Sequence, residues 1–197
     1  MSQQAKVLEM LFVSRVRIKL LNYLFRNAVN PVHLRGAVRD LDEEINAVRR
    51  ELMRMEEIKL VNADVRGNRK YYLLNPKAPF KEELRNLVFK STGLGAEIIE
   101  ESIRLGDIKF AFLGANFLAG GEPATDKVDL VIIGEPNMQA LHALISKIEQ
   151  DSNRQINYAV LKTSEFESAK KRRDAFVTSL IVQTKAVLIG DPDELFA

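Results

Sequence analysis

The stretch INAVRRELMRMEEIKLVNADVRGNRKYYLLNP, residues 45–76, decides the predicted fold of the first half of the chain. Its beginning predicts an α-helix with one buried stripe, because apolar residues recur there at three- and four-residue steps: Ile45, Val48, Leu52 and Met55. Two short β-like runs follow on either side of Arg66-Gly67-Asn68, where the glycine suits the positive φ of a hairpin turn. A helix followed by a hairpin with a basic tip indicates a winged helix-turn-helix.

Two further helices are predicted ahead of this stretch. Ser14 is placed to cap the first, SRVRIKLLNYLFRN, in which apolar residues recur at helical spacing. The second is predicted within NPVHLRGAVRDL, although Gly36 weakens it. Asp40 and Glu43 have the spacing of a capping box, which would start the third helix.

The face of the third helix opposite its apolar stripe is polar and basic, and so is the hairpin tip. Residues 1–90 carry 18 Lys and Arg against 11 Asp and Glu, whereas residues 91–197 carry 11 against 16. A basic half joined to an acidic half suggests that only the first half meets a polyanion. The residues expected to contact duplex DNA are Asn46, Arg49, Arg50, Arg54, Arg66, Asn68, Arg69 and Lys70.

Other interpretations of these charges remain open. Arginines on an exposed helix face are often only a solvated surface, and the acids at residues 42–44 would repel phosphates where the third helix begins. The run KKRRD, residues 170–174, is itself predicted to be a solvated helix face.

Composition excludes several classes of protein. Of 197 residues, 46% are hydrophobic and 28% charged, which is typical of a globular chain. There is no cysteine, and His33 and His142 are the only histidines, so neither a disulfide framework nor a zinc site is expected. No apolar run is long enough to span a membrane, and a cytoplasmic location is expected.

Domain boundaries are predicted from a proline-rich junction, NPKAPF, residues 75–80. The predicted divisions are a DNA-binding domain at 1–80, a connecting helix at 81–104 and an α/β domain at 105–197. The sequence STGLG places two glycines inside the connecting helix and could kink or break it. This segment could pack the two domains together or form a dimer interface, and the sequence does not distinguish these.

The second half alternates β-like runs with helical stretches, which predicts a mixed sheet flanked by helices. Within it, FLGANFLAGGEPATDKVDLVIIG, residues 112–134, places a glycine turn after one strand and an acid on the next. Nucleotidyl transfer needs such a turn for phosphates, and two carboxylates two residues apart to hold Mg²⁺. Lys127 stands where the first carboxylate would be, and we expect it to share a strand face with Asp129.

Two resemblances sharpen these predictions. The order RIKLLNYLFRN, HLRGAV, INAVRREL and GNRKYYLLNP resembles the winged-helix domain of ArsR-like transcriptional regulators, in the subgroup fused to a nucleotidyltransferase-like domain. The second half is similar to the minimal nucleotidyltransferase domain, whose Gly-Ser and Asp-x-Asp motifs align with Gly114, Ala115, Lys127 and Asp129. The resemblance implies a third acid near Asn157 or Ala159, where this chain has none.

These observations together predict a DNA-binding transcriptional regulator that works as a homodimer and lacks enzymatic activity. Its second domain would be a structural module, or a sensor that binds a small anion or nucleotide without metal or other cofactor. The residues expected around such an anion are Gly114, Ala115, Gly120, Gly121, Lys127 and Asp129. The alternatives are an active metal-dependent nucleotidyltransferase and an antitoxin-like interaction protein.

Overall fold

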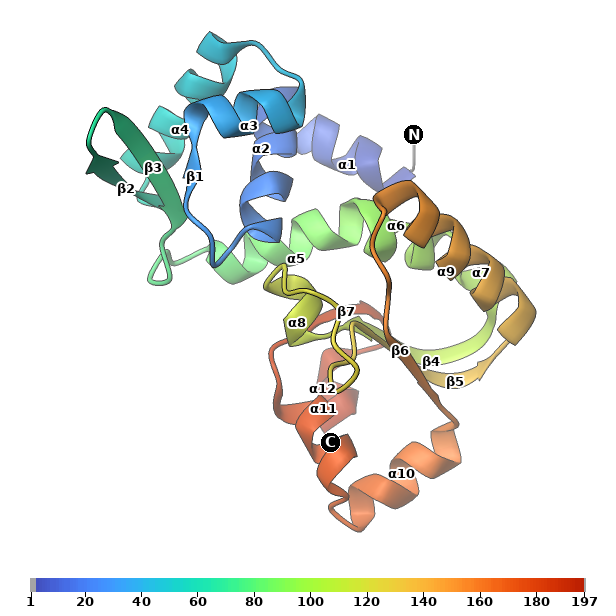
Figure 1. The fold of residues 1–197 in the computed structure, drawn as a ribbon. Helices are drawn as coiled ribbons and strands as arrows, with labels where there is room; N and C mark the ends of the chain where they lie inside the picture. The colour runs from blue at the N-terminus through green and yellow to red at the C-terminus, as the bar shows by residue number, and fades with distance from the viewer. Residues whose placement is uncertain (1–2, 197) are drawn as a thin grey trace.

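The computed structural model describes residues 3–196, which form a helical N-terminal half with a small sheet and a second half built on a larger sheet (Figure 1). The N-terminal half runs α1 (Gln3–Leu11), α2 (Arg15–Arg26), β1 (Val32–His33), α3 (Leu34–Leu41), α4 (Ile45–Glu57), β2 (Val61–Arg66) and β3 (Arg69–Leu74). Its strands are all antiparallel, in the order β1-β3-β2. This is the predicted winged helix-turn-helix arrangement, with α3 and α4 as the helix pair.

Local sequence signals explain the ends of these elements. The Ser14 hydroxyl accepts a hydrogen bond from the Arg17 N–H at 3.2 Å, so the predicted cap of α2 is confirmed. The stripe of α4 is buried at Val48, Leu52 and Met55, but Ile45 at the first turn is exposed. Strands β2 and β3 pair without interruption out to Arg66 and Arg69, which leaves a two-residue turn.

The predicted capping box ahead of α4 is wrong. The chain makes a left-handed turn at Asp42 (φ 50°), so the helix begins after Glu44. The Glu44 carboxylate accepts hydrogen bonds from the N–H groups of Asn46 and Ala47, each at 2.8 Å. These bonds lower the pKa of Glu44, and the bond from the Asn46 N–H has the largest effect.

Three helices connect the halves: α5 (Lys81–Ser91), α6 (Gly93–Glu100) and α7 (Ser102–Leu105). The predicted break occurs within STGLG, where α6 begins at Gly93 with φ 55°. Val88, Phe89, Leu94 and Ile98 are buried within the chain, in a core that also includes residues of both halves. The connecting segment therefore packs the two halves together.

The second half contains β4 (Gly106–Leu113), α8 (Ala115–Leu118), β5 (Leu130–Pro136), α9 (Met138–Ser152), β6 (Tyr158–Leu161), α10 (Thr163–Lys171), α11 (Ala175–Val182), β7 (Ala186–Ile189) and α12 (Pro192–Phe196). The strand order is β6-β5-β4-β7, with β5 and β6 parallel and the other pairs antiparallel. The predicted mixed sheet flanked by helices is confirmed.

Alternation along the central strands divides the core into two layers. Ala111, Leu113, Leu130 and Ile132 face the layer that contains α5, α6 and α9, whereas their strand neighbours pack against α10 and α11. Figure 1 shows α10 and α11 on the side of the sheet away from the N-terminal half. One continuous apolar core thus joins the winged helix to the sheet.

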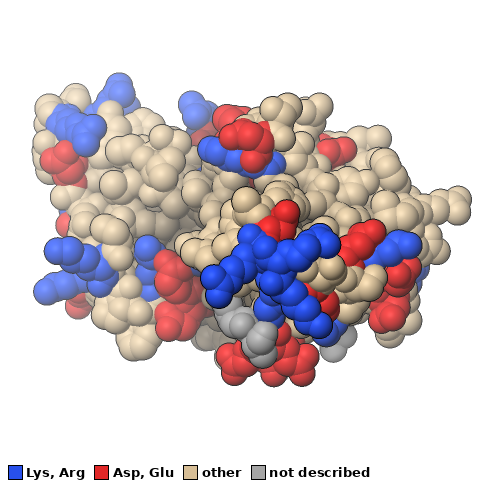
Figure 2. Space-filling view, turned by 90° about the horizontal axis from the view of Figure 1, so that it is seen from below, with Lys and Arg blue, Asp and Glu red and all other residues tan. Residues whose placement is uncertain are grey.

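The end of the molecule formed by α10 and α11 is highly charged. The KKRRD run, predicted to be a solvated helix face, ends α10 with Lys170 and Lys171 and continues into the turn before α11, and Lys171, Arg172 and Arg173 in it are exposed. Seen from below, this end of the molecule carries lysines and arginines close to acidic side chains (Figure 2). Within residues 3–196, no helix has the length and apolar character needed to cross a membrane.

Candidate nucleic-acid interface and the acid site of the second sheet

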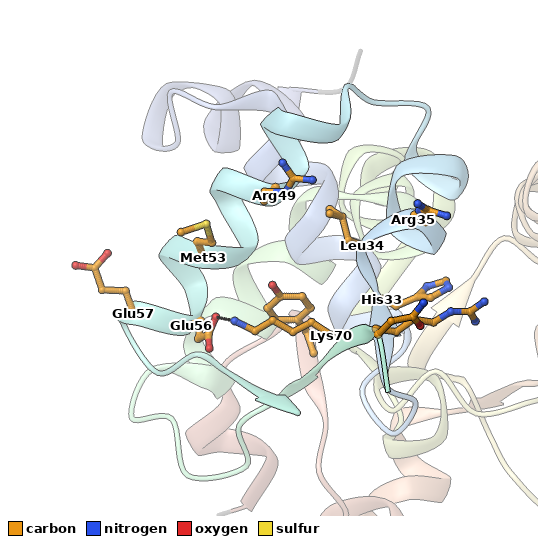
Figure 3. A pocket seen from close by; sticks show the side chains of 11 residues that line it. His33, Leu34, Arg35, Arg49, Met53, Glu56, Glu57 and Lys70 are labelled. Atoms are coloured by element: carbon orange, nitrogen blue, oxygen red, sulfur yellow. Dashed lines mark hydrogen bonds and ion pairs between the residues drawn. The ribbon is translucent and has the colours of Figure 1, made fainter. Parts of the chain in front are cut away.

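A groove of about 750 Å³ lies between the start of α3, the outer face of α4 and the wing formed by β2 and β3 (Figure 3). Its basic lining residues come from all three elements: Arg35, Arg49, Arg69 and Lys70. Glu56 and Glu57 at the end of α4 are the acidic ones. This groove, called the wing groove below, brings together Arg49, Asn68, Arg69 and Lys70 of the residues expected to contact DNA.

The cations around the wing groove are exposed and only lightly engaged. Lys70 donates a hydrogen bond to Glu56 at 2.6 Å and lies over the Tyr72 ring, and this hydrogen bond is the largest of the causes that raise the pKa of Lys70. The Arg49 guanidinium donates to the Asn46 amide oxygen at 3.1 Å. Such exposed contacts contribute little to stability, so these side chains can leave them to bind a partner at a small cost in free energy.

Arg69 lines the groove, whereas Arg50 and Arg66 are exposed cations outside its lining. The Arg66 guanidinium pairs with Asp64 at 2.8 Å, and both side chains are exposed. No hydrogen bond or ion pair engages Arg50 or Arg69 anywhere in the part of the chain that the structure describes. Both residues are exposed, so their guanidinium groups are available to an external anion.

Arg54 has a structural partner instead. Its guanidinium donates to Glu51 at 2.8 Å, and Arg17 from α2 contacts the same carboxylate at 2.8 Å. The Glu51 side chain is only 5% exposed. Burial alone would raise the pKa of this carboxyl, but the hydrogen bond and charge of Arg17 hold it below its usual value. Arg17 therefore ties α2 to α4 through Glu51, and the contact between Arg54 and Glu51 lies within α4.

Sequence reasoning missed Arg35 and His33 at this surface. His33 caps α3 through its Nδ1, which accepts the Gly36 N–H at 3.1 Å. A Cβ at Gly36 would lie 2.6 Å from that imidazole, which explains the glycine in the helix. Arg35 follows two residues later and lines the wing groove. The sequence signal for Arg35 was only that a basic residue stands in the first turn of α3, the helix before the expected recognition helix.

Asp129 of the second half is fully buried (0% exposed) and lies immediately before β5. Its carboxylate accepts hydrogen bonds from the Asn116 amide at 3.2 Å, the Arg154 guanidinium at 3.3 Å and the Asn157 backbone N–H at 3.2 Å. Arg154 also donates to the Gly121 carbonyl at 2.8 Å. We call these residues the Asp129 network.

The prediction that Lys127 and Asp129 share a strand face is wrong. Strand β5 begins only at Leu130, and the chain before it makes an irregular turn that leaves Lys127 exposed while Asp129 is buried. The cation beside Asp129 is the guanidinium of Arg154, at the end of the α9 segment. No local sequence signal pointed to Arg154, because 25 residues separate it from Asp129.

The backbone amides expected to cradle an anion already have acceptors. The N–H of Gly114 donates to the Asp129 carbonyl at 2.8 Å, and that of Ala115 donates to Gln183 at 3.3 Å. The N–H groups of Gly120 and Gly121 donate to Phe117 and Asn116 carbonyls at 3.1 and 2.9 Å. An anion at this turn would have to displace those bonds.

The position where the family resemblance implied a third acid does lie beside Asp129. Asn157 contacts Asp129 through its backbone, and its side-chain amide donates to the Ala124 carbonyl at 2.7 Å. Among residues 3–196, no group of three or more His, Asp or Glu side chains is placed to hold a metal ion. Mg²⁺ requires several hard oxygen ligands, and the single carboxylate here is occupied by three donors.

Comparisons with known proteins do not define a family. No protein-family model matches the sequence, and no curated protein matches it. Among solved structures, human N-acetylserotonin methyltransferase in complex with SAM is similar to 64% of this chain, with 14% sequence identity and a TM-score of 0.30. The match spans 40% of the length of that structure. A similarity at this level supports no conclusion about fold or activity.

Proposed function

We propose that this protein is a duplex-DNA-binding transcriptional regulator of the ArsR-like type that acts in the cytoplasm. The observation that carries the proposal is the wing groove, where basic side chains from α3, α4 and the wing line one concave surface. A winged helix-turn-helix places its recognition helix in the major groove and its wing against the backbone. The phosphate contacts would come from cations that the fold leaves exposed, above all Arg50 and Arg69.

We propose further that the second half lacks nucleotidyltransferase activity and serves the winged helix as a structural module. The one acid at a motif position, Asp129, is desolvated and held by three donors, so it supports the fold. Incubation of the protein with radiolabelled nucleotides and Mg²⁺ should give no transfer to protein or small molecules. Label transfer that disappears in Asp129→Asn would establish the enzymatic alternative instead.

The test of DNA binding is a gel-shift titration with duplex DNA. The double variant Arg50→Glu/Arg69→Glu reverses two unpaired cations at the proposed interface, and we expect its affinity to fall at least roughly 100-fold. The matched control is Lys171→Glu/Arg172→Glu, which makes the same charge change at the turn after α10 and should weaken binding much less. Equal affinities for the wild type and the Arg50→Glu/Arg69→Glu variant would overturn the proposal.

Operator sequence and assembly state follow from two further measurements. Sequencing of genomic fragments retained by the immobilised protein should give an enriched motif, and light scattering should give the mass of a homodimer. Val88, Phe89, Leu94 and Ile98 of the connecting segment are buried within the chain, so a dimer would have to use other residues.

A further inference from the structure

A second cavity, of about 390 Å³, lies where the winged helix meets the sheet domain. Its walls come from the end of α2, the junction of α5 with α6, the α8 turn and the end of α9. Five of the lining residues are apolar or aromatic: Phe89, Leu94, Phe117, Ile148 and Ile156. Its size is within the range of small-molecule sites.

Two arginines from opposite halves of the protein meet in this junction cavity. Arg26 is the last residue of α2, and Arg154 belongs to the Asp129 network. Although Arg26 is exposed at the mouth, the surrounding protein lowers its pKa, first by desolvation and then through the charge of Arg154. Two like charges brought this close repel each other unless an anion joins them.

Neither arginine has all its donors satisfied by the protein. No hydrogen bond or ion pair engages the Arg26 guanidinium within residues 3–196. The Nε of Arg154 is buried and also lacks a partner among the described residues, while the Arg154 guanidinium stacks over Phe117 with its carbon 4.6 Å from the ring centre. Buried guanidinium donors without acceptors are costly, and a bound anion would satisfy them.

Two glycines allow the backbone to close around Arg26. A Cβ at Gly93 would lie 2.8 Å from the Arg26 guanidinium, and one at Gly120 would lie 1.6 Å from the Arg26 carbonyl oxygen. Gly93 also opens α6, and Thr92 before it makes no side-chain cap hydrogen bond. The positive end of that helix therefore points to the same place as the two arginines.

The acidic groups of the lining do not cancel this arrangement. Glu97 pairs with Lys147 at 3.4 Å, and Asp129 lies behind Arg154, outside the lining. Asp151 is exposed, on the last turn of α9. The inner part of the cavity thus combines cationic donors with aromatic walls.

We propose that the junction cavity binds a small organic anion, with a phosphate or carboxylate between Arg26 and Arg154 and an apolar or aromatic body against Phe89 and Phe117. This site borders the glycine turn at Gly120, but its cations are Arg26 and Arg154 and not Lys127, and it does not depend on DNA binding. Because its walls come from both halves, an occupant would contact the winged helix and the sheet domain at once.

The experiment uses the full chain and four probes: phenyl phosphate, benzoate, inorganic phosphate and benzyl alcohol. Isothermal titration should show binding of phenyl phosphate or benzoate, and which of the two is tighter identifies the preferred acid group. Inorganic phosphate and benzyl alcohol should each bind at least roughly tenfold more weakly, because the first lacks the aromatic ring and the second lacks the anionic group.

The variant Arg26→Gln removes one cation without breaking a hydrogen bond or ion pair of the described chain, and it should weaken binding of the aromatic anions at least roughly tenfold. Arg172→Gln, an exposed arginine on the far side of the sheet, is the matched control and should bind as the wild type does. Arg154→Lys keeps a charge beside Asp129, so its folding can be verified by circular dichroism, and it too should bind more weakly. Absence of binding up to about 10 mM, or equal affinity in Arg26→Gln, overturns the proposal.

Discussion

The wing groove and the Asp129 network both gather arginines, but they hold them in opposite ways. In the basic half, Arg50 and Arg69 are exposed and make no hydrogen bond or ion pair within the described chain, and Lys70 has a surface ion pair and lies over the Tyr72 ring. In the network, Arg154 contacts a fully buried carboxylate and a backbone carbonyl, and its side chain is 25% exposed. The first region leaves charge free for a partner, whereas the second uses charge to connect loops within the fold.

This difference supports the proposal that the second half lacks nucleotidyltransferase activity. A catalytic carboxylate must remain accessible to metal and substrate. Asp129 instead accepts hydrogen bonds from Asn116, Arg154 and Asn157, which join α8 and the loop after α9 to the start of β5. Removing its charge should therefore act on stability, while removing charge from the wing groove should act on binding.

The largest expected effect is that of Asp129→Ala. It leaves the Arg154 guanidinium without its carboxylate, and loss of one partner of a buried pair costs about 3–5 kcal/mol of unfolding free energy. Urea denaturation followed by circular dichroism measures this loss. Lys127→Ala is the matched control two residues away and should change stability by less than about 0.5 kcal/mol. Equal effects of the two substitutions would contradict the structural role of Asp129.

A pair of glycine substitutions compares the turn next to the Asp129 network with the tip of the wing. Gly120 and Gly67 have similar positive φ values, 68° and 61°, but a Cβ at Gly120 would meet the Arg26 carbonyl at 1.6 Å, whereas at Gly67 no atom lies within 4 Å. We expect Gly120→Ala to cost about 3 kcal/mol or more through strain and overpacking. Gly67→Ala at the wing tip should cost only about 1–2 kcal/mol. Melting temperatures of the two variants rank these effects, and the reverse order would refute the close packing at the junction.

A smaller effect is expected at Glu51, the buried carboxylate inside the basic half. Glu51→Gln removes charge from its contacts with Arg17 and Arg54 and should cost about 2 kcal/mol at neutral pH. Because Arg17 holds the pKa of Glu51 below its unfolded value, this contribution is present above the ordinary glutamate pKa, about 4.3, and is lost as the pH falls through the lowered folded value. Unfolding curves measured from pH 7 down to about 3 should converge for wild type and variant. A constant difference across that range would show that the charge of Glu51 is not what matters.

Local patterns predicted the elements, and tertiary contacts decided the site. The stripe from Val48 to Met55 and the turn at Gly67 depend on residues close in sequence, so the helix and the hairpin could be predicted. Glu44 took the cap position because of a left-handed turn at Asp42, which spacing alone does not reveal. The role of Arg154 arises only when the loop after α9 folds against Asp129, so no sequence pattern predicted it.

The most direct test of the account is the salt dependence of duplex-DNA affinity, measured by fluorescence anisotropy at several salt concentrations. If the exposed cations of the first half contact phosphates, the logarithm of the association constant falls linearly with the logarithm of salt concentration. Replacing Arg50 and Arg69 with glutamine should make that slope shallower by roughly two, about one for each phosphate that is no longer neutralised. Lys127→Gln should leave the slope unchanged. An identical slope for wild type and the Arg50→Gln/Arg69→Gln variant would contradict the central claim that these charges are held free for DNA.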